Sequence, residues 1–199
     1  MIGRKSLLYG VHQFVWHPIT VWLAWYHLYG RPTFKETICI IIHDWGYWFT
    51  PNMDGPEGEK HPVYGARIAG ELFGEEYYNL VLLHSRHYAR LVGKDPSKLC
   101  WADKLSILYD PKWFYLIRAV ASGEIREYRI NASQYIPLTA SHSMWFDWLK
   151  PKFIKLAAER KGDAVPYSNL ITFPSHHFFN RRRIMDLSYR KKRSQQRNR

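Results

Sequence analysis

The chain has 199 residues, with 29 Lys and Arg against 17 Asp and Glu, which gives a formal net charge of +12. Its 46% hydrophobic and 23% charged residues exclude an intrinsically disordered protein, because such chains lack the apolar residues that a packed core requires. One domain is expected at this length, and a fold of this size needs no disulfide or structural metal merely to fold.

Most of the positive charge lies at the carboxyl end. Residues 181–199 contain seven Arg and two Lys against one acid, Asp186, so they carry +8 of the total +12. Clustered basic residues bind the phosphate backbone of nucleic acids without sequence preference. This segment therefore supports one hypothesis, a non-enzymatic nucleic-acid-associated protein, and equally a solubilising tail on a protein with another function.

The two cysteines and the apolar stretches indicate a cytoplasmic protein. Cys39 and Cys100 lie far apart without paired spacing, a pattern typical of reduced thiols. The opening MIGRKSLLYG lacks the features of a secretory signal. Residues 11–30 contain no Asp, Glu, Lys or Arg, but they include three His and one Pro, so we expect no membrane span.

Helix start and stop signals recur along the chain whereas strand alternation is rare, so we expect an all-α fold. Thr33 and Glu36 form a capping box before an Ile-rich run, although such a run also suits a buried strand. The expected helices span about residues 19–29, 33–46, 62–74, 75–91, 95–109, 112–128 and 141–161. The sixth is expected to break at Ser122 and Gly123, and the last to kink at Pro151.

These helices predict a compact single-domain bundle over residues 1–162. The residues with functional chemistry fall in about 12–110, and the helices of 111–162 complete the bundle. We expect an irregular extension over 163–180 and a mobile basic tail over 181–199. The longest connection, 47–60, is rich in Gly, Pro and acidic residues, and it borders the expected site as a specificity lid.

Histidine and aspartate recur about once per expected helix, near positions that a helical hairpin brings to the same end. They are His17, His43, Asp44, His61, His84 and Asp103. Imidazole and carboxylate ligands suit iron, manganese, nickel, cobalt or zinc. The set is larger than one ordinary mononuclear site requires, which favours two divalent transition-metal ions. The competing interpretation is chance, because ten histidines will supply some pattern.

This ordered set, with the strings LLHSRHYA and CWADKLS around its last two positions, resembles the HD-domain superfamily of metal-dependent phosphohydrolases. The resemblance covers about residues 12–110. It implies an HD-type helical bundle and an enzyme that hydrolyses a phosphate ester or anhydride, such as a nucleotide, with a metal-activated water. It implies that the core metal ligands are His17, His43, Asp44 and Asp103, and that His61 and His84 are the extra ligands of two-metal members.

The spacing around His84 and Asp103 is similar to that in bacterial hydrolases that split symmetrical dinucleoside tetraphosphates. One departure concerns the residues after the His-Asp pair. The chain reads HDWGYW, with Tyr47 where the family usually has Lys. Other cations are therefore expected to contact phosphate, unless they belong to solvated helix faces. These are Lys60, Arg86 and Arg90 as substrate-binding residues, and Lys104 as a catalytic residue.

His87 follows His84 by three residues, so a continuous helix would place both on one face. It can be a ligand in place of His84, a general acid for the leaving group, or a residue that supports the ligands. We favour His84 as the ligand and His87 as a phosphate or proton partner, with Asp44 orienting the nucleophile.

One further alternative remains within the same superfamily. A branch of it uses the same six ligands to hold two iron ions for the oxidative cleavage of small molecules. The ligand set alone does not separate this oxygenase chemistry from hydrolysis. Iron-dependent consumption of oxygen would favour the oxygenase.

Overall fold

The computed structural model describes residues 1–161, with side chains described through residue 155. The predicted extension (163–180) and basic tail (181–199) lie outside the described residues. All regular structure in residues 1–161 is helical, so the predicted all-α class is confirmed. The α-helices are α1 (Ile2–Tyr9), α2 (Trp16–Tyr29), α3 (Phe34–Ile42), α4 (Pro62–Phe73), α5 (Glu75–Leu82), α6 (Arg86–Leu91), α7 (Lys98–Leu105), α8 (Lys112–Ser122), α9 (Glu124–Asn131) and α10 (His142–Lys161). Three short 3-10 helices are η1 (Trp45–Phe49), η2 (Gly58–Lys60) and η3 (Ser106–Tyr109).

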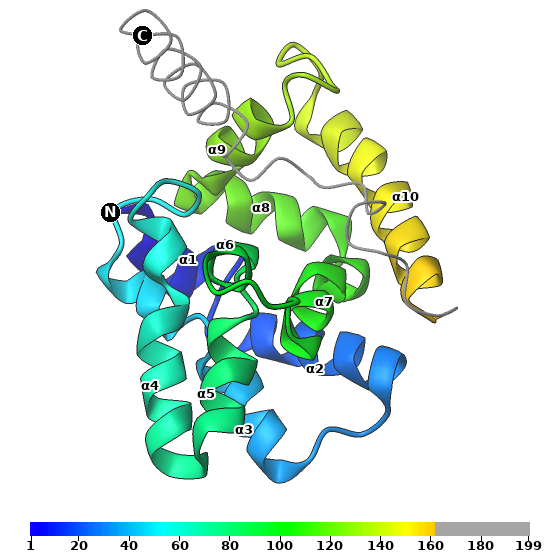
Figure 1. Cartoon of the computed structure of the whole chain (residues 1–199). Helices are drawn as coiled ribbons and strands as arrows, with labels where there is room; N and C mark the ends of the chain where they lie inside the picture. Colours follow the sequence, from blue (N-terminus) through cyan, green and yellow to red (C-terminus); the bar gives the residue numbers. More distant parts are fainter. Residues whose placement is uncertain (162–199) are drawn as a thin grey trace, which may run out of the picture.

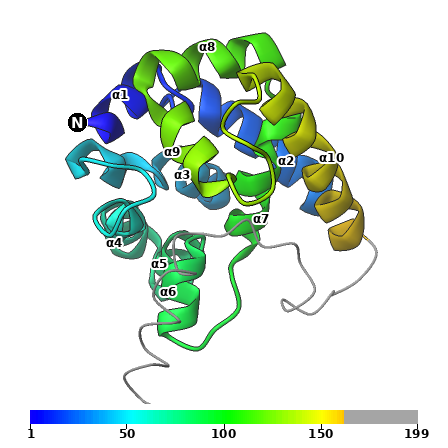
Figure 2. The same ribbon diagram turned by 90° about the horizontal axis from the view of Figure 1, so that it is seen from above.

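The helices form two groups, with α2 and α7 between them (Figure 1). The group of α3, α4 and α5 packs with α2 and α7 around one apolar cluster. The group of α8, α9 and α10 packs around a second cluster. Seen from above, α1 lies next to α8 (Figure 2). These two groups of helices are the two halves of the fold. Helices α2 and α7 lie between them, and the candidate site lies where the halves meet.

Local capping confirms two of the predicted helices. The Thr33 side chain accepts a hydrogen bond from the Glu36 backbone N, and the Glu36 carboxylate accepts one from the Thr33 backbone N. This capping box makes the Ile-rich run the helix α3 rather than a strand. Helix α4 begins at Pro62 and ends before Gly74, whose φ of 95° suits a residue without a side chain.

The prediction of one continuous helix over residues 75–91 is wrong. The structure divides this segment into α5 and α6, and His84 lies in the break rather than on a helix. Ser85 has an extended backbone, and its side chain accepts a hydrogen bond from the His87 backbone N at 3.2 Å. Serine is a favoured residue at this position because it satisfies an N–H at the start of the helix.

Other boundaries also differ from the expectation. Helix α2 begins at Trp16, so His17 lies in its first turn instead of before it, and α3 ends at Ile42, so Asp44 follows the helix. Helix α7 begins after Ser97. The break between α8 and α9 at Gly123 is confirmed. Pro151 lies within α10, and the kink there stays a prediction. The sequence interpretation missed α1, and the 47–60 connection contains η1 and η2.

Two glycines allow α4 to approach the end of α3 closely. A Cβ at Gly46 would lie 1.9 Å from the His61 carbonyl oxygen, and one at Gly65 would lie 2.4 Å from the Ile42 carbonyl oxygen. Neither position has room for a methyl group. Gly46 was expected to end the second helix, but its importance lies in this contact, which places His61 beside the end of α3.

None of the helices described combines the length and the hydropathy needed to cross a bilayer. Cys39 and Cys100 are both buried, and no disulfide joins them. The large separation of the two cysteines along the chain predicts this result, namely two reduced thiols.

Candidate metal centre

The six predicted metal ligands converge on one buried cluster between the two halves of the fold. They form two groups that share one carboxylate, and within each group the possible ligand atoms lie within 4.8 Å of one another. The first group is His17, His43, Asp44 and Asp103, and the second is Asp44, His61 and His84. The order of these residues in the sequence therefore predicts their proximity in space.

In the first group, two histidines face two carboxylates. The Nε2 atom of His17 lies 3.3 Å from Asp44 Oδ2 and 3.1 Å from Asp103 Oδ1. The Nε2 atom of His43 lies 3.3 Å from the same Asp44 oxygen. Three of these four residues are fully buried, and the Asp103 side chain keeps 23% of its exposure. Asp103 is thus the most exposed member of this group.

In the second group, two histidines face the other oxygen of Asp44. Asp44 Oδ1 lies 3.6 Å from His61 Nε2 and 3.5 Å from His84 Nε2. The two Nε2 atoms are 3.0 Å apart. Because Asp44 Oδ2 belongs to the first group and Oδ1 to the second, this carboxylate has the placement of a bridge between two ions.

Three of the histidines are oriented by the backbone. The Nδ1 atoms lie 2.7 Å from the Ile40 carbonyl for His43, 2.7 Å from the Gly58 carbonyl for His61, and 2.5 Å from the Val81 carbonyl for His84. A carbonyl only accepts hydrogen bonds, so each Nδ1 carries the proton. In the neutral ring, Nε2 then presents a lone pair to the cluster, as a metal ligand must.

Several polar atoms in the cluster are buried without a hydrogen bond. These are Nε2 of His17, Nε2 of His43 and Oδ2 of Asp44. Buried polar atoms rarely remain unsatisfied, because each costs about 1–3 kcal/mol. A divalent ion would satisfy all three, and the nitrogen and oxygen donors match iron, manganese, nickel, cobalt or zinc. The residues present therefore fit a bound metal, and their two groups fit two ions.

The two groups differ in their affinity for protons. Burial lowers the pKa of His43, but the carboxylates of Asp44 and Asp103 outweigh it and raise that pKa to about 10. Burial also opposes ionisation of Asp44, yet His43 and His17 hold its pKa well below the usual range. For His61, burial and the neighbouring His84 lower the pKa to about 3. In the metal-free protein, a proton thus occupies the first group and is excluded from His61.

Tyr47, which follows the His-Asp pair by three residues, packs against one of the candidate ligands. Tyr47 is 7% exposed, and its ring stacks on that of His61, with centroids 4.1 Å apart and an interplanar angle of 6°. Burial and the charge of Asp44 raise the pKa of Tyr47 well above its usual value, so the phenol stays neutral. Tyr47 therefore orients His61 and carries no charge to phosphate.

The sequence interpretation missed His12, which lies beside the cluster. Its ring centroid is 5.0 Å from that of His17 and 5.1 Å from that of Tyr47. Its Nδ1 atom is 3.0 Å from Oε1 of Glu124, at the start of α9. Because 112 residues separate His12 from Glu124, no local sequence signal could have paired them.

Glu124 is fully buried and accepts hydrogen bonds from several directions. Its donors are the Ser6 hydroxyl, the Ser122 hydroxyl, the Val11 backbone N and the Tyr128 hydroxyl. Burial lowers the pKa of His12, but the bond to Glu124 together with the charges of Glu124, Asp44 and Asp103 outweighs this effect and raises that pKa to about 9. This network connects α1, α8 and α9 to the edge of the metal cluster.

A cavity of about 310 Å³ opens onto the metal ligands. Among the predicted phosphate contacts, Arg86, His87 and Lys104 line it, whereas Lys60 and Arg90 are exposed and lie outside its lining. Burial and the nearby Arg86 lower the pKa of Lys104. The structure therefore brings three of the five predicted cationic or proton-donating residues to the metal centre.

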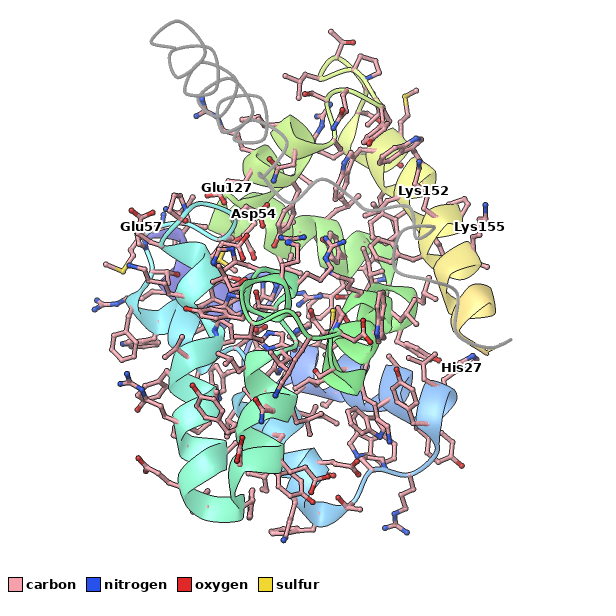
Figure 3. The ribbon with its side chains drawn as sticks, viewed as in Figure 1. His27, Asp54, Glu57, Glu127, Lys152 and Lys155 are labelled. Carbon is pink, nitrogen blue, oxygen red and sulfur yellow. The ribbon has the colours of Figure 1, made fainter. Side chains whose placement is uncertain are left out.

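The loop before η2 is attached to α9 at the edge of this cavity. The backbone N atoms of Met53 and Asp54 each donate to Glu127 Oε2 at 3.1 Å, and Asn131 Nδ2 donates to Asp54 Oδ2 at 2.6 Å. Figure 3 shows Asp54 and Glu127 close together, with Glu57 further out. Asp54 and Glu59 line the cavity. The predicted lid segment thus forms a cavity wall, while its closure remains a prediction.

The chain was compared with protein-family models, with curated proteins and with solved structures, and none of them matches it.

Proposed function

We propose that this chain is a metal-dependent phosphohydrolase of the HD superfamily, which hydrolyses a phosphate ester or anhydride of a nucleotide. The observation that carries the proposal is the position of Asp44 between two histidine groups, with one oxygen toward each. This arrangement supports two divalent ions bridged by one carboxylate, as the resemblance implies. Paired divalent ions are typical of enzymes that displace phosphate in line.

The metal ions would supply a water of lowered pKa and a positive charge for the phosphoryl oxygens. The residues of the chain would do the rest. Asp44 holds the nucleophile in line with the phosphorus. Arg86 binds two phosphate oxygens through its planar guanidinium group, and Lys104 contributes a point charge. His87, which also lines the cavity, would hold a proton near the leaving oxygen.

The cations of the cavity favour hydrolysis over the two-iron oxygenase. Arg86 and Lys104 line the same cavity as the candidate metal ligands, and a phosphoryl group has the charge that they would neutralise. An oxygenase acting on a neutral molecule has no need of them. Oxygen consumption that requires iron, in the absence of phosphate release, would reverse this preference.

The direct test combines metal analysis with a panel of nucleotides. The purified protein is analysed for transition metals and assayed for phosphate release from nucleoside mono-, di- and triphosphates. We expect His43→Ala and Asp44→Ala to lose bound metal and at least about 1,000-fold in turnover. His27→Ala is the matched control, because His27 is exposed at the end of α2, away from the cluster (Figure 3). Full metal content and full activity in both site variants would refute the proposal.

A further inference from the structure

Helix α8 exposes apolar residues and buries polar ones. The residues that it buries against the rest of the fold are Tyr115, Arg118, Ala119 and Ser122. The large residues that it exposes are Trp113, Ile117 and Val120, at 67%, 60% and 50% of their surface. A helix at a protein surface normally has the opposite arrangement, with its apolar side toward the core and its polar side in water. The polarity of α8 is therefore inverted.

The inner side of α8 accommodates a charge because Arg118 has partners there. Its Nη2 atom binds the Asp110 carboxylate, and its Nη1 atom donates to the carbonyl oxygens of Gly10 and Val11, both at 3.1 Å. A buried charge is tolerated when it is paired and hydrogen-bonded in this way. These bonds also attach the segment between α1 and α2 to α8. They explain the inner side of the helix and leave its apolar outer side unexplained.

The exposed apolar surface continues onto the segment between α1 and α2. The ring of Trp16 contacts that of Phe114, with centroids 5.4 Å apart, and the two residues before Trp16 are about half exposed. We call the five exposed residues the α8 face, which consists of Phe14, Val15, Trp113, Ile117 and Val120. Figure 2 shows α8 along one edge of the molecule, and no element of the described part of the chain covers this face.

The α8 face has the area that a stable interface with a second copy requires. At about 200 Å² for each large side chain, exposed fractions of 49–67% correspond to roughly 600 Å² per chain. Monomeric proteins rarely leave a larger apolar patch in water. A two-fold pair would bury this area from both chains, and the total reaches the range of about 1,200–2,000 Å² that is typical of specific interfaces.

The charges at this face also favour a second copy over other occupants. Two chains of net charge +12 repel each other, so they associate best through a neutral surface. None of the five residues is charged, and the exposed cation of α8, Lys112, is paired with Asp147 at 2.5 Å. An anionic membrane or a nucleic acid is recognised through Lys and Arg, which the α8 face does not contain.

We propose that the chain forms a homodimer in which α8 packs antiparallel against α8 of a second copy. Trp113, Ile117 and Val120 are spaced by four and three residues, so they form one ridge along the helix. A two-fold axis through Ile117 places Trp113 of each chain against Val120 of the other, a large side chain against a small one. Every contact then occurs twice, as in an isologous interface. The dimer does not depend on the proposed phosphohydrolase activity.

Association is measured by sedimentation velocity of the full chain at increasing concentration. We expect a monomer–dimer equilibrium for the wild type. Ile117→Asp places two like charges at the two-fold axis and should weaken association at least about 30-fold, with an unchanged circular dichroism spectrum because the residue is exposed. Leu72→Asp is the matched control, since Leu72 is 61% exposed on α4, and it should associate as the wild type does. A monomeric wild type, or equal weakening in both variants, would overturn the proposal.

A second measurement tests the antiparallel geometry by cross-linking. Ile117→Cys places two thiols at the axis, and mild oxidation should join them, because a disulfide needs Cβ atoms about 3.5–4.5 Å apart. Cys39 and Cys100 are buried, so they should not compete, and Leu72→Cys measures random collisions. Cross-linking at residue 117 no faster than at residue 72 would contradict this interface. A monomer that binds neutral phosphatidylcholine vesicles, and loses this binding in Ile117→Asp, would identify the face as a membrane surface and refute the dimer.

Discussion

The Nε2 atoms of His61 and His84 lie 3.0 Å apart, although each ring has its Nδ1 on a backbone carbonyl. Two nitrogens that bind one tetrahedral ion at about 2.0–2.1 Å lie about 3.3 Å from each other. The pair is thus spaced as two ligands of a common ion. Because both Nδ1 atoms carry the protons, the lone pairs of the two Nε2 atoms lie close together and repel each other. A metal ion bound to both nitrogens would remove this repulsion.

The first prediction concerns metal stoichiometry. His61→Ala should remove the ion of the second group and leave that of the first, because His61 does not belong to the first group. We expect the metal content to fall from two ions per chain to one after dialysis, as measured by mass spectrometry of the metals. His27→Ala should retain two. Loss of both ions in His61→Ala at an unchanged unfolding midpoint would contradict the division into two groups.

The second prediction concerns the contact between α3 and α4. A methyl group at Gly65 would lie 2.4 Å from the Ile42 carbonyl oxygen, which belongs to rigid backbone. Gly65→Ala should therefore lower the free energy of unfolding by about 1–3 kcal/mol, measured by urea denaturation, and weaken metal binding by displacing His61.

Gly70→Ala is the matched control on the same helix. Its Cβ would lie 3.1 Å from the Tyr78 Cβ, a crowded contact but a less severe one than the 2.4 Å approach at Gly65. Because Ala favours helix over Gly by about 1 kcal/mol, this gain offsets part of the crowding, and Gly70→Ala should lose less stability than Gly65→Ala. An equal loss of stability in both variants would show that the Gly65 contact has no special role.

The third prediction concerns the buried acceptor Glu124. Glu124→Gln keeps the shape of the side chain but places an amide NH₂ among groups that all donate hydrogen bonds. We expect a loss of about 1–3 kcal/mol in the free energy of unfolding. The pKa of His12, followed by NMR, should fall from about 9. Glu76→Gln, at an exposed position of α5, should change neither quantity.

The fourth prediction gives the pH range over which this pair stabilises the metal-free protein. The pKa of Glu124 is lowered from 4.5, so its contribution is present above that pH and is lost as the pH falls. The pKa of His12 is raised from 6.5 to about 9, so its contribution is complete below 6.5 and is lost as the pH rises through about 9. The stability difference between wild type and Glu124→Gln should therefore be largest between pH 4.5 and 6.5. A difference that grows above pH 9 would contradict this account.

The fifth prediction concerns the basic residues 181–199. Their deletion should leave phosphate release within about twofold, and it should abolish retention of a labelled single-stranded DNA at low salt, because nonspecific binding depends on Lys and Arg contacts to phosphate. Loss of turnover on deletion would contradict the assignment of the tail as an accessory segment.

The proximity of the six candidate ligands could be predicted from the sequence because each one lies at or near a helix end. The signals for those ends, such as the capping box at Thr33 and Pro62 at the start of α4, are local. The break at Ser85 also has a local signal, since serine favours the start of a helix. The amphipathic continuity of residues 75–91 obscured it.

The remaining features depend on residues distant in the sequence. His12 meets Glu124 across 112 residues, and Arg118 reaches the Gly10 carbonyl from α8. No period, cap or motif connects such residues, because the packing of the two halves alone brings them together. The role of Gly46 could not be predicted for the same reason. Its close approach to His61 is a tertiary contact and not a helix stop.

The hydrogen bonds from the ligand histidines to carbonyls three residues earlier have a consequence for metal exchange. His43 and His84 cap carbonyl groups in the last turns of α3 and α5, where helices lack internal donors. The folding of each helix end therefore fixes the orientation of its own ligand. The rings are therefore ordered by the fold itself, and if the cluster binds metal, we expect an ion to leave and return without refolding of the bundle.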